Sequence, residues 1–130
     1  MTRTFFAPLI GLLLFGAALL PAEANASHNE FHGLWASQDV VDGSFQLMTI
    51  GGGSTPGMVL LDFDATVACP GGGLAIVSGR GEVDGSTMTV DPARIRCAGS
   101  GPAGSVVFAL TDQGDGTLMD SAGSTWYRVF

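Results

Sequence analysis

Short segments in which apolar and polar residues alternate, cut by glycine-rich turns, constrain this chain more than any other feature. Successive side chains of a β-strand point to opposite faces, so strict alternation predicts strands with one face in the core and the other in water. The stretch MVLLDFDATV is the clearest example. There we expect Val59, Leu61, Phe63, Ala65 and Val67 to face the core, and Asp62, Asp64 and Thr66 to face solvent.

Glycine-rich breaks divide the chain into about eight strands. No segment keeps the 3.6-residue apolar period over the ten or so residues of a helix. Asp42-Gly43 and Asp84-Gly85 each separate two strands, as type I′ hairpin turns do. The expected strands are 33–40, 44–50, 58–67, 74–83, 86–97, 105–111, 116–120 and 124–130. Short connections between so many strands favour an all-β fold, a small antiparallel up-and-down barrel; the alternative is a β-sandwich.

Residues 1–26 have the composition of an export signal. Arg3 supplies a positive charge, Leu9 to Leu20 is apolar, and Ala24-Asn25-Ala26 fits the small-x-small cleavage rule. The apolar run is too short for the roughly 20 residues of a membrane-spanning helix. We therefore predict a secreted, periplasmic or otherwise extracytoplasmic protein, with a single β domain over 27–130 and no membrane attachment after cleavage.

The charge balance excludes whole classes of partner. The signal holds one of the 5 basic and one of the 12 acidic residues, so the mature chain keeps a net charge of −7. All its basic residues are arginines, because the chain has no lysine. Nucleic acids and anionic lipid surfaces bind to cationic faces, so neither is an expected partner.

The two cysteines, Cys69 and Cys97, indicate a disulfide because the chain is expected to enter an oxidising compartment. The chain-entropy model gives such a bridge roughly 3.5 kcal/mol of stabilisation. The alternatives are a metal-binding pair and a catalytic thiol. A metal pair would need further ligands, and the two histidines lie far away in the sequence.

Gly33-Leu34-Trp35 on the first expected strand, together with Arg128 on the last, resembles the signature of lipocalin-like (calycin) barrels. The resemblance implies that the guanidinium of Arg128 covers the indole of Trp35 at the closed end of a barrel. The final stretch DGTLMDSAGSTWYRVF is similar to the last hairpin of small bacterial inhibitors of secreted metalloproteases. Those inhibitors insert an N-terminal arm into the protease, whereas only residues 27–32 would precede Gly33 here.

Side chains capable of chemistry are few and poorly placed for catalysis. His28 and His32 have the i, i+4 spacing of a helical zinc pair, but they lie in a segment expected to be extended. Asp62 and Asp64 would share a solvated face, so we do not expect them to form an acid–base pair. There is no G-x-S-x-G elbow and no cofactor motif. We expect no enzyme activity, no catalytic residue, no cofactor and no metal site.

Two further interpretations concern binding. Arg94 and Arg96 share one strand face and could pair with Asp62 and Asp64 or bind an anion. The apolar residues expected to fill the interior are Leu47, Val59, Leu61, Phe63, Ile76, Val106, Phe108 and Leu110. A packed interior favours a non-enzymatic binding module that acts through its outer surface or loops, with an unknown protein or small molecule as partner. The alternative function is inhibition of a secreted protease.

Overall fold

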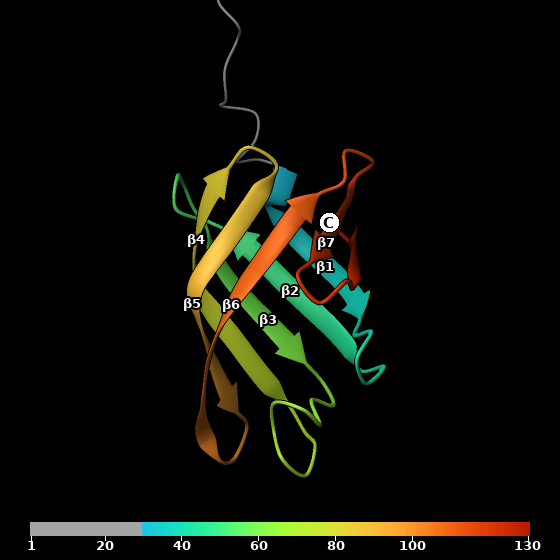
Figure 1. Ribbon diagram of the computed structural model, residues 1–130, viewed down its shortest axis with the longest axis vertical. Helices are drawn as coiled ribbons and strands as arrows, with labels where there is room; N and C mark the ends of the chain where they lie inside the picture. Colours follow the sequence, from blue (N-terminus) through green and yellow to red (C-terminus); the bar gives the residue numbers. More distant parts are fainter. Residues whose placement is uncertain (1–29) are drawn as a thin grey trace, which may run out of the picture.

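The computed structural model describes residues 30–130, which form a closed barrel of eight antiparallel strands in sequence order (Figure 1). The strands are β1 (Gly33–Gln38), β2 (Phe45–Gly51), β3 (Gly57–Asp62), β4 (Ala75–Asp84), β5 (Thr87–Cys97), β6 (Gly101–Asp112), β7 (Thr117–Asp120) and β8 (Thr125–Arg128). The predicted up-and-down barrel is confirmed, and the sandwich alternative is wrong. The expected signal and its cleavage site lie outside the described residues.

Most strand ends differ from the expected ones by one or two residues, and three differences change how the strands pair. Strand β3 ends at Asp62 instead of continuing to residue 67, because the following residues leave the sheet as a loop that reaches β4. Strand β6 begins at Gly101, four residues earlier than expected. In the β4–β5 hairpin Asp84 pairs with Thr87, so the turn residues are Gly85 and Ser86 rather than Asp84 and Gly85.

The alternation in β3 has the opposite phase to the predicted one. Met58 and Leu60 are buried inside the barrel with exposed fractions of 1% and 3%, whereas Val59 is 43% exposed on the outside. Asp62 also points inward and is buried, so the prediction that it faces solvent is wrong. Residues 58–61 are all apolar, so either set of alternate side chains could fill the interior. Asp62 tolerates burial because it accepts a hydrogen bond from Gln46 inside the barrel.

Most residues predicted to fill the interior do not. Leu47, Val59, Leu61, Phe63 and Ile76 are on the outside or only half-buried, and Val106 is 43% exposed. Leu110 is buried as predicted, and Phe108 packs against the core from a half-buried position. The observed core cluster consists of Phe31, Trp35, Met48, Ile50, Met58, Leu60, Met88, Val90, Ala93, Leu110, Leu118 and Trp126.

The disulfide between Cys69 and Cys97 is present, as predicted, with a Cα–Cα distance of 5.7 Å. It ties the loop between β3 and β4 to the end of β5, and it packs with Ala65 and Ala75 in a second small core. The bridge is consistent with an extracytoplasmic location. Among the described residues no helix is long and apolar enough to cross a membrane.

Candidate interaction surface

The first candidate residues lie at the closed end of the barrel. The guanidinium carbon of Arg128 is 4.3 Å from the centroid of the Trp35 ring, so the predicted contact is present. The same guanidinium donates hydrogen bonds to the carbonyl oxygens of His32 and Glu30. Gly33 lies beside them with a φ of +140°, and a Cβ there would lie 2.7 Å from Nη1 of Arg128. The three residues therefore close this end of the barrel together.

The outer face of β8, β1, β2, β3 and β4 carries an apolar row that crosses all five strands. The inward neighbours of the row, including Trp35, Met48 and Leu60, are buried, so the row itself faces outward. Direct cross-strand pairing defines it. In order, its members are Tyr127, Ala36, Leu47, Leu61 and Ile76.

Two stacked aromatic residues extend this row towards the β1–β2 turn. The ring centroids of Phe45 and Phe63 are 5.9 Å apart, and the two side chains are 54% and 46% exposed. A hollow of about 430 Å³ is lined by Phe45, Tyr127, Ala36, Ser37 and Gln38. We call the row, together with Phe45 and Phe63, the outer apolar face.

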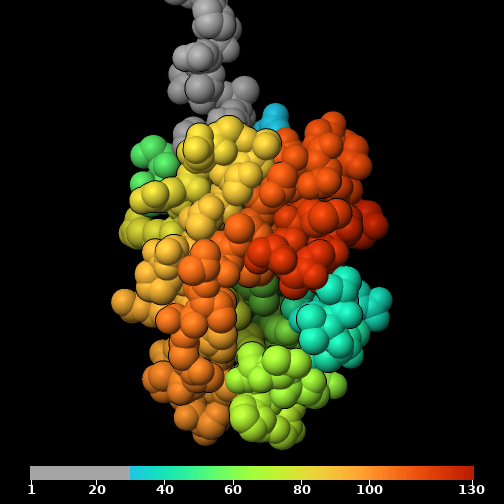
Figure 2. All heavy atoms as spheres, viewed as in Figure 1, coloured from blue at the N-terminus to red at the C-terminus, as the bar shows by residue number. Residues whose placement is uncertain are grey.

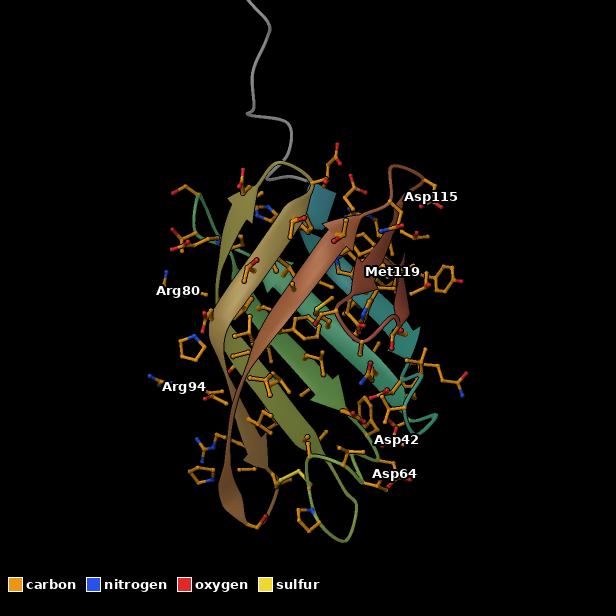
Figure 3. The ribbon with its side chains drawn as sticks, viewed as in Figure 1. Asp42, Asp64, Arg80, Arg94, Asp115 and Met119 are labelled. Carbon is orange, nitrogen blue, oxygen red and sulfur yellow. A yellow bond between two sulfur atoms is a disulfide. The ribbon has the colours of Figure 1, made fainter. Side chains whose placement is uncertain are left out.

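The outer apolar face ends at arginines on β5. Ile76 pairs with Arg96, and Ser78, two residues further along β4, pairs with Arg94. Both arginines are exposed, and Figure 3 shows Arg94 and the nearby Arg80 extending away from the sheet. The side-chain hydrogen bonds within residues 30–130 include those of Arg128 but none of these three arginines. Their cationic groups therefore face solvent beside the apolar row.

The interpretation that Arg94 and Arg96 pair with Asp62 is wrong, because Asp62 points into the barrel while the arginines point out. Asp62 accepts a hydrogen bond of 3.0 Å from Nε2 of Gln46. Asp64 lies in the loop after β3, near Asp42, and Figure 3 shows both on the opposite side of the view from Arg94. Asp62 and Asp64 therefore do not share a face.

The carboxylate of Asp42 is held by hydrogen bonds in this loop region. The backbone N–H of Ser44 donates to Oδ1 of Asp42, and Thr66 donates to Oδ2 from both its hydroxyl and its backbone N–H. The bonds from Ser44 and then Thr66 lower the pKa of the Asp42 carboxyl. These bonds tie the β1–β2 loop to the loop that follows β3.

Residues 30–130 contain no group of three or more histidine, cysteine or acidic side chains placed to hold a metal ion. His32 is half-buried beside the closed end, and its Nε2 atom has no hydrogen-bond partner. Its expected neighbour His28 lies outside the described residues. Near the same end, a hydrogen bond and the negative charge of Asp112 raise the pKa of Glu30.

No family model, curated protein or solved structure matches this chain. The function therefore has to be inferred from the geometry of the chain itself. The outer apolar face is the feature that sequence reasoning missed, since Leu47, Leu61, Phe63 and Ile76 were assigned to the core. The sequence of β3 does indicate an apolar outer face. Its four consecutive apolar residues, 58–61, leave neither face of the strand polar.

Proposed function

We propose that this protein is a secreted, non-enzymatic binding module of lipocalin-like architecture that docks a partner protein on its outer apolar face. The observation that carries the proposal is the row from Tyr127 to Ile76, which the closed barrel leaves facing outward and which no strand or helix of residues 30–130 covers. A contiguous exposed apolar patch bordered by polar residues is the kind of surface that a protein partner covers.

The dimensions of this face indicate how far the partner extends. With strands about 4.8 Å apart, the row from β8 to β4 is about 19 Å long. The outer apolar face is about 13 Å wide along the strands, which gives an area of about 250 Å². A stable interface buries about 800 Å² on each partner, so the contact must continue past the apolar row.

The neighbouring arginines indicate the chemistry of the partner. Arg96 and Arg94 stand at the β5 border of the face, in a protein whose net charge is −7. A partner that covers the face and continues over β5 meets these two guanidinium groups. The surface of the partner is therefore an apolar patch bordered by carboxylates, because complementary charge steers association and fixes orientation.

Two features support the lipocalin-like part of the proposal. The eight strands follow one another around a closed barrel, and Arg128 lies over Trp35 at one end. Export is supported by the composition of residues 1–26 and by the disulfide. An intact mass beginning at Ser27 in protein recovered from the medium would establish the cleavage site.

A capture experiment tests the docking face. The exported protein is immobilised and exposed to culture medium and solubilised cell envelope of the producing organism. We expect a partner to bind the wild type and the Met119→Ser variant, but not a Phe45→Ser/Phe63→Ser double variant. Met119 is the control because it is an exposed apolar residue of β7, a strand that contributes no residue to the outer apolar face.

Arg94→Gln and Arg96→Gln should slow association and weaken its dependence on salt. Equal capture by the phenylalanine double variant would contradict the proposal. If the captured protein is a secreted metalloprotease whose activity falls on mixing, the module is an inhibitor of that protease.

A further inference from the structure

The wall of the barrel is incomplete beside β6. Strand β6 pairs with β5 from Gly101 to Thr111, but it pairs with β7 only at residues 110–112. Strands β7 and β8 have 4 residues each, so neither reaches the other half of β6. Figure 2 shows a hollow there, between the lower part of β6 and the loops that follow β1 and β3. We call this opening the mouth.

On the side of β6 that faces the mouth, backbone groups pair with no strand of residues 30–130. The carbonyl oxygen of Ala109 accepts a 3.0 Å hydrogen bond from the N–H of Ser121, on the β7 side of the strand. In an antiparallel strand the N–H and C=O of one residue point to the same side, and the side alternates along the chain. The N–H and C=O groups of Val107 and Ser105 therefore point to the open side as well.

The open edge is apolar and carries no charge. Val107 is 59% exposed, and Val106 is 43% exposed although its side chain is on the interior face. Residues 97–111 contain no acidic or basic residue. Proteins protect free edges with charges, prolines or covering elements, because unpaired backbone recruits other strands. Pro102 protects only the far end of this edge.

Buried polar atoms near the mouth lack partners. Gln46 is 6% exposed, and its Nε2 donates to Oδ2 of Asp39 at 3.1 Å and to Oδ2 of Asp62 at 3.0 Å. Its Oε1 atom and the Oγ atom of Ser44 have no hydrogen-bond partner. Burial raises the pKa of Asp39, and the carboxylates of Asp42, Asp62 and Asp120 raise it further. Within residues 30–130 no arginine or histidine side chain donates a hydrogen bond to Gln46 or to Asp39 and Asp62.

We propose that the edge of β6 binds an extended, basic segment of a partner protein, which adds to the sheet as a strand. The segment pairs with the free N–H and C=O groups of Ser105 and Val107 and places an apolar residue against Val106. A lysine or arginine of the segment reaches the acceptor oxygens of Gln46, Asp39 and Asp62. Backbone pairing of this kind supplies affinity, and the side-chain positions supply specificity.

A second copy of this protein does not meet these requirements. Its own β6 edge has no cation to offer to Gln46 and the two aspartates, and its net charge is also −7. Charge complementarity therefore favours a foreign basic segment over self-pairing. The site is separate from the outer apolar face, so either proposal can fail without the other.

The probe is a phage-displayed library of random twelve-residue peptides, selected against the exported protein. Val107→Pro removes one edge N–H, and Val107→Thr keeps that N–H and the β-branched shape. We expect enriched peptides to carry an apolar residue and a lysine or arginine two positions apart, because both side chains must face the interior. They should bind the wild type and Val107→Thr, and bind Val107→Pro at least tenfold more weakly. They should still bind a Tyr127→Ser variant, which changes the exposed β8 end of the outer apolar face.

Amide hydrogen exchange on the wild type gives a second readout that does not depend on the proline variant folding. Bound peptide should slow exchange at Ser105 and Val107. Unchanged exchange at these amides, equal binding to a folded Val107→Pro protein, enrichment of acidic peptides, or no enrichment over the support would each overturn the proposal. Self-association that disappears in Val107→Pro would also overturn it, because the occupant would then be a second copy.

Discussion

Asp120 shows how one buried carboxylate organises the end of the chain. Its Oδ2 accepts a 2.9 Å hydrogen bond from the indole N–H of Trp126, and its Oδ1 accepts bonds of the same length from the N–H groups of Ala122 and Ser124. The side chain is 8% exposed. A carboxylate suits this position because it accepts at both oxygens, so it satisfies donors on two sides.

Asp120→Asn should therefore destabilise the protein by about 2–3 kcal/mol, the usual value of a hydrogen bond to a charged group. An asparagine has only one acceptor oxygen, so its NH₂ group would face either the indole N–H or the backbone donors. Urea unfolding followed by tryptophan fluorescence measures the change. Asp84→Asn is the control, since Asp84 is exposed beside a hairpin turn. Equal stability of the two variants would contradict this account of Asp120.

Arg128→Ala should lower stability by about 1–2 kcal/mol, because the cation–π contact and the hydrogen bonds to two carbonyl oxygens are lost together. The emission of Trp35 should shift to the red as its ring becomes solvated, while Trp126, which is fully buried elsewhere in the core, should be unaffected. Arg128→Lys keeps the charge but not the planar stacking, so it should recover only part of the loss. An unchanged spectrum and midpoint for Arg128→Ala would show that this contact does not close the barrel.

At the scale of elements, β4 depends on two glycines that face the β5 strand. The register between the strands shifts between Ser78 and Gly81. A Cβ at Gly79 would collide with the side chain of Val90 and lie 3.0 Å from the carbonyl oxygen of Pro92. A Cβ at Gly81 would lie 2.8 Å from Cγ of Met88. The two strands can therefore approach closely here only if β4 has no side chain at these positions.

Gly79→Ala should destabilise the barrel by about 1–3 kcal/mol, the usual cost of overpacking a core. Thermal unfolding by circular dichroism measures it. Gly53→Ala is the matched control, because a Cβ there meets nothing within 4 Å and its φ lies outside the left-handed region. If both variants melt at the wild-type temperature, the close approach of β4 to β5 is not a constraint.

At the scale of the whole molecule, the carboxyl groups respond to folding in opposite directions. The Asp112 carboxyl raises the pKa of Glu30, and burial raises the pKa of Asp39. Hydrogen bonds lower the pKa of Asp42, through Ser44, and of Asp115, through Thr117. Groups with raised pKa values bind protons more readily in the folded state, and groups with lowered values bind them less readily.

Stability should consequently rise as the pH falls from 7 towards the ordinary values of 4.5 for Glu30 and 3.8 for Asp39, because the folded state takes up protons first. Below 3.8 it should fall, since the stabilisation from ionised Asp42 and Asp115 is lost. Melting temperatures at pH 7, 5 and 3 measure both changes. Glu30→Gln should reduce the rise between pH 7 and 5. A monotonic loss of stability on acidification would contradict the assigned shifts.

Local patterns in the sequence determined the number of strands, their order and the pairing of the cysteines. Glycine-rich turns interrupt the chain too often for long helices to form. The short connections place consecutive strands side by side, so these strands pair. The contact between Trp35 and Arg128 also followed from two short stretches of sequence. These features depend on residues close together in the chain or on a resemblance between short motifs.

Tertiary structure alone decided which face of β2, β3 and β4 is inside. Met58 and Leu60 occupy the interior while Leu61 lies outside, yet all three are apolar, and the hydrophobic pattern of β3 is nearly the same for either phase. Asp62 is accommodated in the interior by its cross-strand partner Gln46, whose Nε2 donates a hydrogen bond to it. The outer apolar face and the open edge of β6 both depend on contacts between residues far apart in the chain. A period-two pattern separates the two faces of a strand, but it does not predict which face those contacts bury.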